Sequence, residues 1–158
     1  MTEVSSVAHC DVPLEVAFEY LDDYRNVTDY WYGMQSYQPV GELDHGLDSV
    51  FEATSKLGPS TVKSTVKTVR WERNALVEYK SVSGLDTATS FVFSAVDESR
   101  STVEFRIEFH LPGGIAGRAM EKTLAPFVHT AVESTARSIS VRVAEYYAAR
   151  QAASGATE

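Results

Sequence analysis

The long C-terminal helix that follows a series of strands is the feature that most constrains the fold of this chain. Residues Ile115 to Arg150 have the periodicity of one long amphipathic helix, and residues 34–111 before it have the two-residue period of strands. Gly113 and Gly114 separate the two parts. Because such a helix must bury its apolar stripe against the sheet, the sequence predicts an α+β domain in which a helix covers a curved antiparallel sheet, with room for a ligand between them.

Short turns join the predicted strands, which is typical of an antiparallel meander. The alternation is clearest in the last strand, where Val103, Phe105, Ile107 and Phe109 occupy one face and charged residues and a histidine occupy the other. Seven strands are expected, at residues 3–10, 34–42, 49–57, 60–71, 75–82, 87–97 and 101–111.

Two short helices are expected between the first and second strands. Pro13 fits the first turn of a helix, where no backbone donor is lost, and the apolar spacing after it continues to about residue 22. A second short helix is expected near residues 25–30, ending before Gly33.

The C-terminal helix is expected to turn one apolar stripe toward the sheet. Pro126 predicts a break or kink at the mouth of the cavity, between residues 123 and 126. Small and polar residues after Ala152 predict fraying, so we expect a single domain over residues 1–150 and a frayed tail over residues 151–158. The stripe comprises Leu124, Val128, Ala131, Thr135, Ile139, Val143 and Tyr146.

Charge and cysteine content argue against several classes of partner. The formal net charge of −8 disfavours binding to nucleic acid or to an anionic membrane surface. The single cysteine, Cys10, is expected to be an inert buried thiol, and nothing in the sequence requires an oxidising compartment. No stretch approaches the roughly 18 apolar residues of a membrane span and no signal peptide is recognisable, so a cytoplasmic location is expected. The sequence specifies no oligomeric state.

Known catalytic and cofactor motifs are not found in the sequence. The four histidines, His9, His45, His110 and His129, do not have the spacing of metal ligands, so no metal site is expected. There is no Gly-x-Ser-x-Gly elbow, no phosphate-binding loop and no dinucleotide-binding fingerprint. The sequence therefore predicts neither a nucleophilic triad nor a cofactor.

Aromatic residues give the best indication of a binding site. Phenylalanines at inward positions suit a plain core equally well, but buried Tyr and Trp need a polar partner or water, which a cavity provides. Glu121, Ser64 and Thr65 are weaker candidates for polar groups there. The residues expected to line the pocket are Trp31, Met34, Tyr37, Phe51, Tyr79, Phe91, Phe105, Met120, Leu124 and Val128.

The order of strand, two short helices, six strands and long helix resembles the helix-grip superfamily, also called SRPBCC or START-like, with a Bet v 1-like fold. The chain is most similar to its branch of polyketide cyclases, dehydrases and lipid transport proteins, through residues 12–18 (VPLEVAF), residues 29–34 (DYWYGM) and the closing helix. The resemblance implies a deep pocket that many members use for lipids, sterols or polyketides, while a minority catalyse cyclisation, dehydration or hydrolysis. It transfers no catalytic residue, because the superfamily shares none.

Three hypotheses of function follow. The first is a carrier or sensor of a hydrophobic small molecule, such as a lipid or polyketide. The second is a cyclase or dehydratase in which Tyr79 or Tyr37, with Glu121, acts as general acid and base. The third is a protein-interaction module that uses the outer sheet face or the helix. The first two differ in whether a titratable side chain with a hydrogen-bonded partner lies in the cavity.

Overall fold

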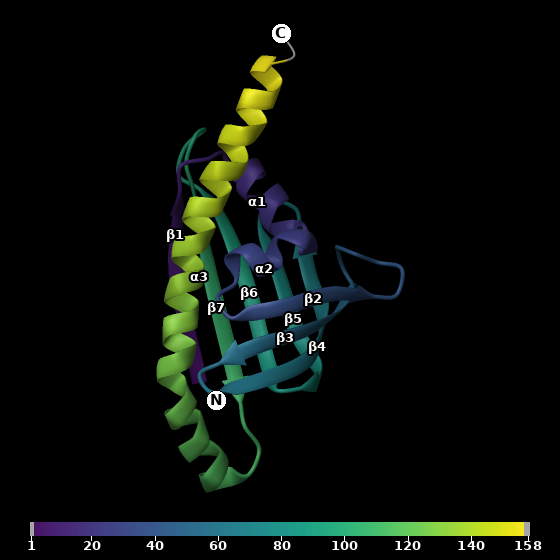
Figure 1. The fold of residues 1–158 in the computed structure, drawn as a ribbon, viewed down its shortest axis with the longest axis vertical. Coiled ribbons are helices and arrows are strands. Elements are labelled where there is room, and N and C mark those ends of the chain that lie inside the picture. The colour runs from purple at the N-terminus through teal and green to yellow at the C-terminus, as the bar shows by residue number, and fades with distance from the viewer. Residues whose placement is uncertain (1, 157–158) are drawn as a thin grey trace.

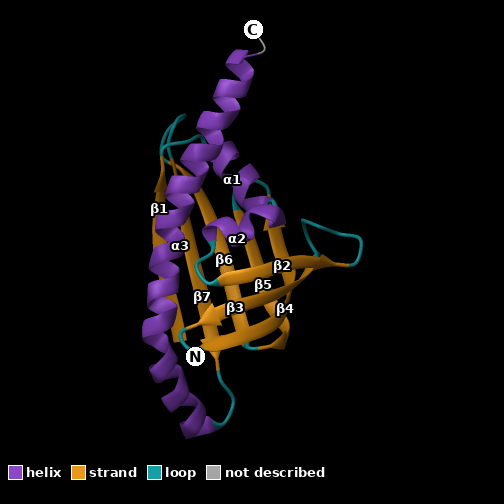
Figure 2. Ribbon diagram, viewed as in Figure 1, coloured by secondary structure: helices purple, strands orange, loops and turns teal. Residues whose placement is uncertain are grey.

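Seven antiparallel strands form one sheet in the computed structural model, which describes residues 2–156 (Figure 2). The strand order is β1-β7-β6-β5-β4-β3-β2, so β1 and β2 are the two edges. The meander and the strand positions predicted from the sequence are confirmed. The strands are β1 Thr2–Cys10, β2 Met34–Val40, β3 Val50–Leu57, β4 Ser60–Glu72, β5 Leu76–Gly84, β6 Asp86–Ala95 and β7 Ser101–His110.

The sheet is strongly curved. In Figure 1, β2 and β3 run across the direction of β6 and β7. The register of β4 against β5 shifts between Thr65 and Val66 and again between Thr68 and Arg70, and irregularities of this kind bend a strand and increase its twist. The curvature gives the sheet a concave face on which the helices lie.

The connection from β1 to β2 holds α1 Leu14–Asp22, the 3-10 helix η1 Tyr24–Asn26 and α2 Val27–Tyr30. The two helical segments predicted here are thus present, with η1 leading directly into α2. Helix α1 follows Pro13 and buries the apolar face that includes Phe18, whose ring packs edge-on against Phe93 at 5.0 Å between ring centroids. The short helices therefore cover one end of the concave face.

Helix α3 is one continuous helix, Gly114–Ala156, and it packs chiefly on β1 and β7 (Figure 1). Of the two alternatives predicted at Pro126, a break or a kink, the break is wrong. Both Pro126 and Lys122, whose carbonyl loses its backbone donor to the proline, are exposed, so water can satisfy that carbonyl. The helix also continues past Arg150, where the sequence predicted its end. Among the described residues, no helix has the length and apolarity needed to cross a bilayer.

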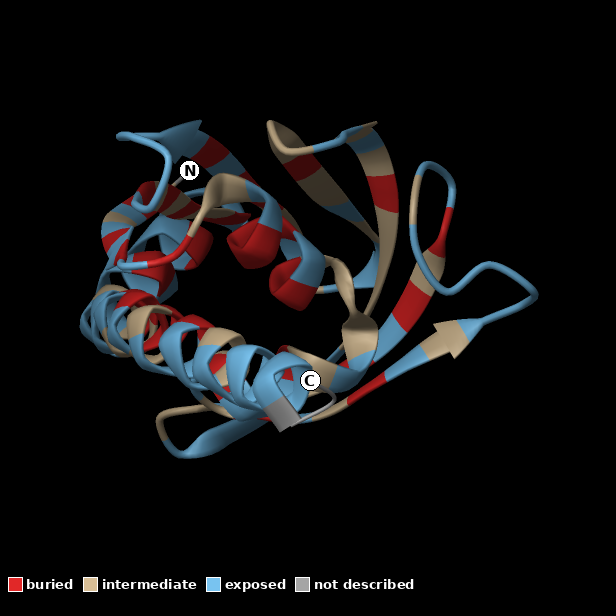
Figure 3. Ribbon diagram, turned by 90° about the horizontal axis from the view of Figure 1, so that it is seen from above, coloured by how far each residue is buried: buried red, intermediate tan, exposed pale blue. Residues whose placement is uncertain are grey.

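The core lies between α3 and the concave face of the sheet, where the inward residues of sheet and helix are buried (Figure 3). The alternation predicted for β7 is confirmed, since Val103, Phe105 and Phe109 are buried. Of the stripe predicted for the helix, Leu124, Ala131 and Tyr146 are only half-buried. The fully buried residues of α3 in this region are Val128, Val132, Thr135, Ala136, Ile139 and Val143.

Candidate functional site

A small cavity of about 110 Å³ lies between the sheet, α3 and the segment that follows α2. We call it the inner cavity. Its wall comes from β2 to β7, from the turn between β5 and β6 and from the segment after α2, and α3 closes it with Val128 and Ala131. The lining residues are Trp31, Tyr32, Met34, Tyr37, Ala53, Ser55, Lys56, Leu57, Val62, Ser64, Val66, Tyr79, Leu85, Thr87, Thr89, Ile107, Val128 and Ala131.

Half of the residues predicted to line the pocket do line it. They come from three elements, β2, β5 and α3, and from the loop after α2, so the fold brings together residues that are far apart in the sequence. Ser64 also lines the cavity, whereas Thr65, its neighbour in β4, lines only a separate hollow that Ser64 borders too. The five predicted residues that line the cavity are Trp31, Met34, Tyr37, Tyr79 and Val128.

Phe51, Phe91 and Phe105 lie behind the lining and do not form it. Phe51 stacks on Tyr37 with 4.7 Å between ring centroids. Phe105 meets Trp31 edge-on at 5.0 Å, and Phe91 meets the same indole at 5.9 Å. These phenylalanines therefore fix the orientation of the Tyr37 and Trp31 rings that face the cavity.

The N-terminal part of α3 contributes less than the sequence predicted. Met120 is 53% exposed, whereas the next residue, Glu121, is buried, so Met120 lies on the solvent side of the helix. Leu124 is half-buried against the core without lining the cavity. Glu121 is buried, but its carboxylate accepts a hydrogen bond from Thr2 at 3.4 Å and lies 4.0 Å from His110, outside the cavity.

Hydroxyl groups supply the polar part of the inner wall. The side chains of Tyr37 and Tyr79 are hydrogen-bonded to each other, and burial raises the pKa of both phenols well above the ordinary value. Both therefore stay protonated at neutral pH, and because one O–H is used within the pair, the other can donate to a ligand. The lining contains no carboxylate and no imidazole, and Lys56, which is exposed, is its one charged residue.

Several lining residues were not predicted. Ile107 was placed on the inward face of its strand, and the two-residue period could have indicated it as a lining residue. Thr87 and Thr89 in β6 carry no such signal, because threonine suits either face of a sheet. The sequence analysis therefore predicted the hydroxyls of the tyrosines and of Ser64 in the cavity wall, but not those of Thr87 and Thr89.

The volume of the inner cavity limits what it can hold. Pockets for drug-sized molecules measure about 300–1,000 Å³, whereas an apolar cavity of roughly 150 Å³ binds benzene. A cavity of about 110 Å³ therefore accepts a single small ring, and a complete lipid does not fit inside it.

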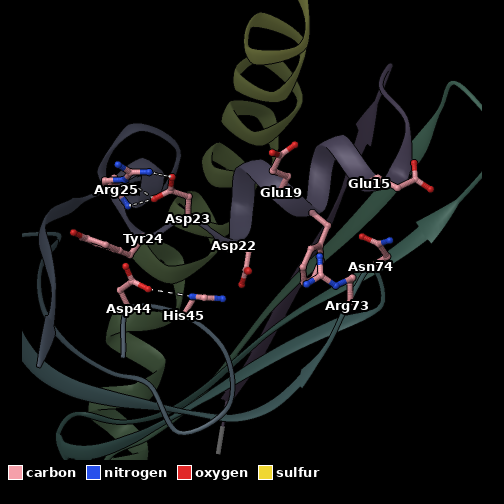
Figure 4. Close-up of a pocket in the computed structure, with 11 residues that line it drawn as sticks. Glu15, Glu19, Asp22, Asp23, Tyr24, Arg25, Asp44, His45, Arg73 and Asn74 are labelled. Atoms are coloured by element: carbon pink, nitrogen blue, oxygen red, sulfur yellow. Dashed lines mark hydrogen bonds and ion pairs between the residues drawn. The ribbon is translucent and has the colours of Figure 1, made fainter. Parts of the chain in front are cut away.

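A second hollow, of about 570 Å³, is a polar groove on the outside of α1 (Figure 4). Here Trp71 donates to the carboxylate of Asp22 at 2.8 Å, and burial raises the pKa of that carboxyl. The neighbouring charges are already paired, since Arg25 donates to Asp23 and His45 lies 3.1 Å from Asp44. The groove is more polar and more open to solvent than the inner cavity, so the inner cavity is the better candidate site.

Metal and thiol chemistry find no support in the described residues. Between residues 2 and 156, no three His, Cys, Asp or Glu side chains come together in a way that could hold a metal ion. Cys10 is buried, as predicted, and burial raises the pKa of its thiol to about 12. At neutral pH it is protonated and a poor nucleophile.

This architecture, a long helix held in a curved antiparallel sheet, defines the helix-grip class with a Bet v 1-like fold. Residues 1–143 match the family described as "Polyketide cyclase / dehydrase and lipid transport". The chain belongs to this family, as the resemblance in the sequence implied. No curated protein matches the chain.

Solved structures show the same fold at low sequence identity. A Thermus thermophilus protein superposes with a TM-score of 0.78 at 18% identity, covering 92% of this chain and 99% of its own. The Zhui aromatase/cyclase of a Streptomyces species has a TM-score of 0.63 at 13% identity, covering 85% and 93%. Norcoclaurine synthase from Thalictrum flavum has a TM-score of 0.67 at 13% identity, covering 91% and 87%.

Proposed function

We propose that the protein binds an uncharged hydrophobic molecule through a ring-sized group held in the inner cavity, and that it acts as a carrier or sensor. The observation that carries the proposal is the lining, which is apolar apart from hydroxyls and the exposed Lys56, with the paired phenols of Tyr37 and Tyr79 among the hydroxyls. Membership of a family of cyclases, dehydrases and lipid transport proteins supports ligand binding in general.

The cyclase or dehydratase hypothesis has one observation in its favour, namely a phenol pair that can act as a general acid. General acid and base catalysis also needs a group that accepts a proton near neutral pH. Glu121, the expected base, lies outside the cavity, and the raised pKa values of Tyr37 and Tyr79 make both unsuitable as bases. Binding without a covalent step is therefore the better supported function.

The test is a calorimetric titration with phenol, supported by NMR shifts of the cavity-lining residues. We expect phenol to bind the wild-type protein and Ala53→Leu, which fills the cavity, to abolish binding. Ala88→Leu is the matched control, because Ala88 lies in a hollow on the outer face of the sheet, and this variant should bind phenol as the wild type does.

Tyr79→Phe tests the contribution of the phenol pair. It should weaken the binding of phenol by about fivefold, the effect of one neutral hydrogen bond. Failure of phenol to bind, or equal binding by both leucine variants, would contradict the proposal.

A further inference from the structure

A groove of about 640 Å³ on the surface adjoins the inner cavity. We call it the outer groove. It lies between α3 and the turn that joins β3 to β4. Tyr32, Lys56, Leu57 and Ala131 line both the groove and the cavity, so the two spaces meet at a shared wall. The groove is completed by Gly33, Gly58, Phe127 and Thr130.

Two large aromatic side chains flank the outer groove without being buried. Phe127 is 42% exposed and Tyr32 is 54% exposed. The Phe127 ring rests directly on the β3–β4 turn, because a Cβ atom on Gly58 would lie only 2.9 Å from its carbons, and Gly58 has a positive φ of 60°. Exposed aromatic surface that adjoins a cavity is typical of a ligand-binding groove.

We infer that the ligand is elongated, with a ring-sized head in the inner cavity and an apolar tail in the outer groove against Phe127. This inference rests on the proposed function. The inner cavity is too small for more than the head, while the groove is larger and shares four of its lining residues with the cavity. A tail in the groove would cover the exposed faces of Phe127 and Tyr32, which no described part of the chain covers fully.

A series of phenols with a growing alkyl chain at the para position tests this inference. For phenol, 4-butylphenol and 4-hexylphenol, the affinity of the wild-type protein should rise by up to about fourfold for each methylene that leaves water. Phe127→Ala should weaken 4-hexylphenol by about tenfold and leave phenol unchanged. Val141→Ala is the matched control, since Val141 is a similarly exposed apolar residue of the same helix, 55% exposed and outside the groove.

The outcomes separate the inference from the proposed function. If phenol itself fails to bind, the proposed function is wrong. If phenol binds but the affinity does not rise with chain length, the function stands and the tail inference is wrong. If the affinity rises but Phe127→Ala behaves as Val141→Ala does, the tail lies elsewhere and the assignment to the groove is overturned. NMR shifts at Gly58 and Thr130, present with 4-hexylphenol and not with phenol, would support it independently.

Discussion

Two neighbouring carboxyl groups at the end of α1 have opposite environments. Burial raises the pKa of Asp22, and its hydrogen bond from Trp71 only partly opposes that effect. In contrast, hydrogen bonds from the side chain and backbone of Arg25 hold the pKa of Asp23 below its ordinary value. Adjacent residues of the same type therefore make contributions of opposite sign to the dependence of stability on pH.

The raised pKa of Asp22 predicts a stability that declines with rising pH. The folded carboxyl holds its proton to a higher pH than the unfolded one, whose ordinary value is 3.8. Its contribution is complete below that value and is lost as the pH rises through the folded pKa. We expect Asp22→Asn, which keeps an acceptor for Trp71, to gain free energy of unfolding relative to the wild type as the pH rises from below 3.8 to neutrality. Urea unfolding at several pH values measures the difference.

Asp23→Asn is the control, and its sign is opposite. The lowered pKa of Asp23 gives stability that is present above the unfolded pKa and lost as the pH falls through the folded pKa. Relative to the wild type, this variant should therefore lose stability as the pH rises through the acid range. Parallel curves for the two variants would refute the assignment of the two environments.

At the scale of elements, one hydroxyl joins α3 to the segment after α2. Thr135 is fully buried in α3, where its Oγ1 accepts from the backbone amide of Tyr32 at 3.0 Å and donates to the carbonyl of Ala131 at 2.6 Å. Tyr32 and Ala131 line both the inner cavity and the outer groove. The residue therefore fixes the position of the helix at the place where the two spaces meet.

Replacing this hydroxyl should loosen the junction. Thr135→Val leaves the partly buried amide of Tyr32 without its acceptor, and we expect the free energy of unfolding to fall by about 1 kcal/mol. Thr135→Ser retains the hydroxyl and loses one methyl group, at about 0.8 kcal/mol. Hydrogen exchange distinguishes the two, because the Tyr32 amide should exchange rapidly in the valine variant only. Continued protection of that amide in Thr135→Val would show that the hydroxyl does not hold it.

For the whole molecule, regular periodicity made most of the fold predictable from the sequence. The alternation of Val103, Phe105 and Phe109 predicted the inward face of β7, and the turn residues located the strands. The role of the first turns of α3 was harder to predict, because Met120 has an apolar side chain and is nevertheless 53% exposed. Pro126 was misleading, since an exposed helix face tolerates a missing hydrogen bond that a buried face does not.

The site was less predictable than the fold, because a cavity depends on volume and not on residue type. Phe51 and Tyr37 have similar patterns in the sequence, yet Tyr37 faces the cavity while Phe51 supports it from behind. Which ring faces the space depends on packing between strands that are far apart in the chain. The size of the cavity, about 110 Å³, has no counterpart in the sequence at all.

The net charge of −8 also acts on the whole molecule. Excess negative charge disfavours the compact state by self-repulsion, and exposed ion pairs such as Arg100 with Asp97 contribute little against it. Raising sodium chloride from about 0.01 M to about 1 M shortens the screening length from about 30 Å to about 3 Å. We therefore expect salt to increase the free energy of unfolding by about 1 kcal/mol.

A charge-reduced variant provides the control for this effect. Glu15 and Glu98 are exposed, so replacing both by Gln removes two negative charges with little change in packing. The increase with salt should be smaller in this variant. An equal increase in both proteins would attribute the effect to general salting-out of apolar surface and not to charge.

Two neighbouring residues of the uninterrupted α3 line different spaces, Phe127 the outer groove and Val128 the inner cavity, and Val132 one turn later lies in the core. A ligand that binds only the folded helix must therefore protect its amides from local opening, by a free energy that grows with the logarithm of ligand concentration. The hydrogen-exchange rates of the backbone amides of residues 127–136, compared with and without ligand, would therefore report the fraction of protein that is occupied.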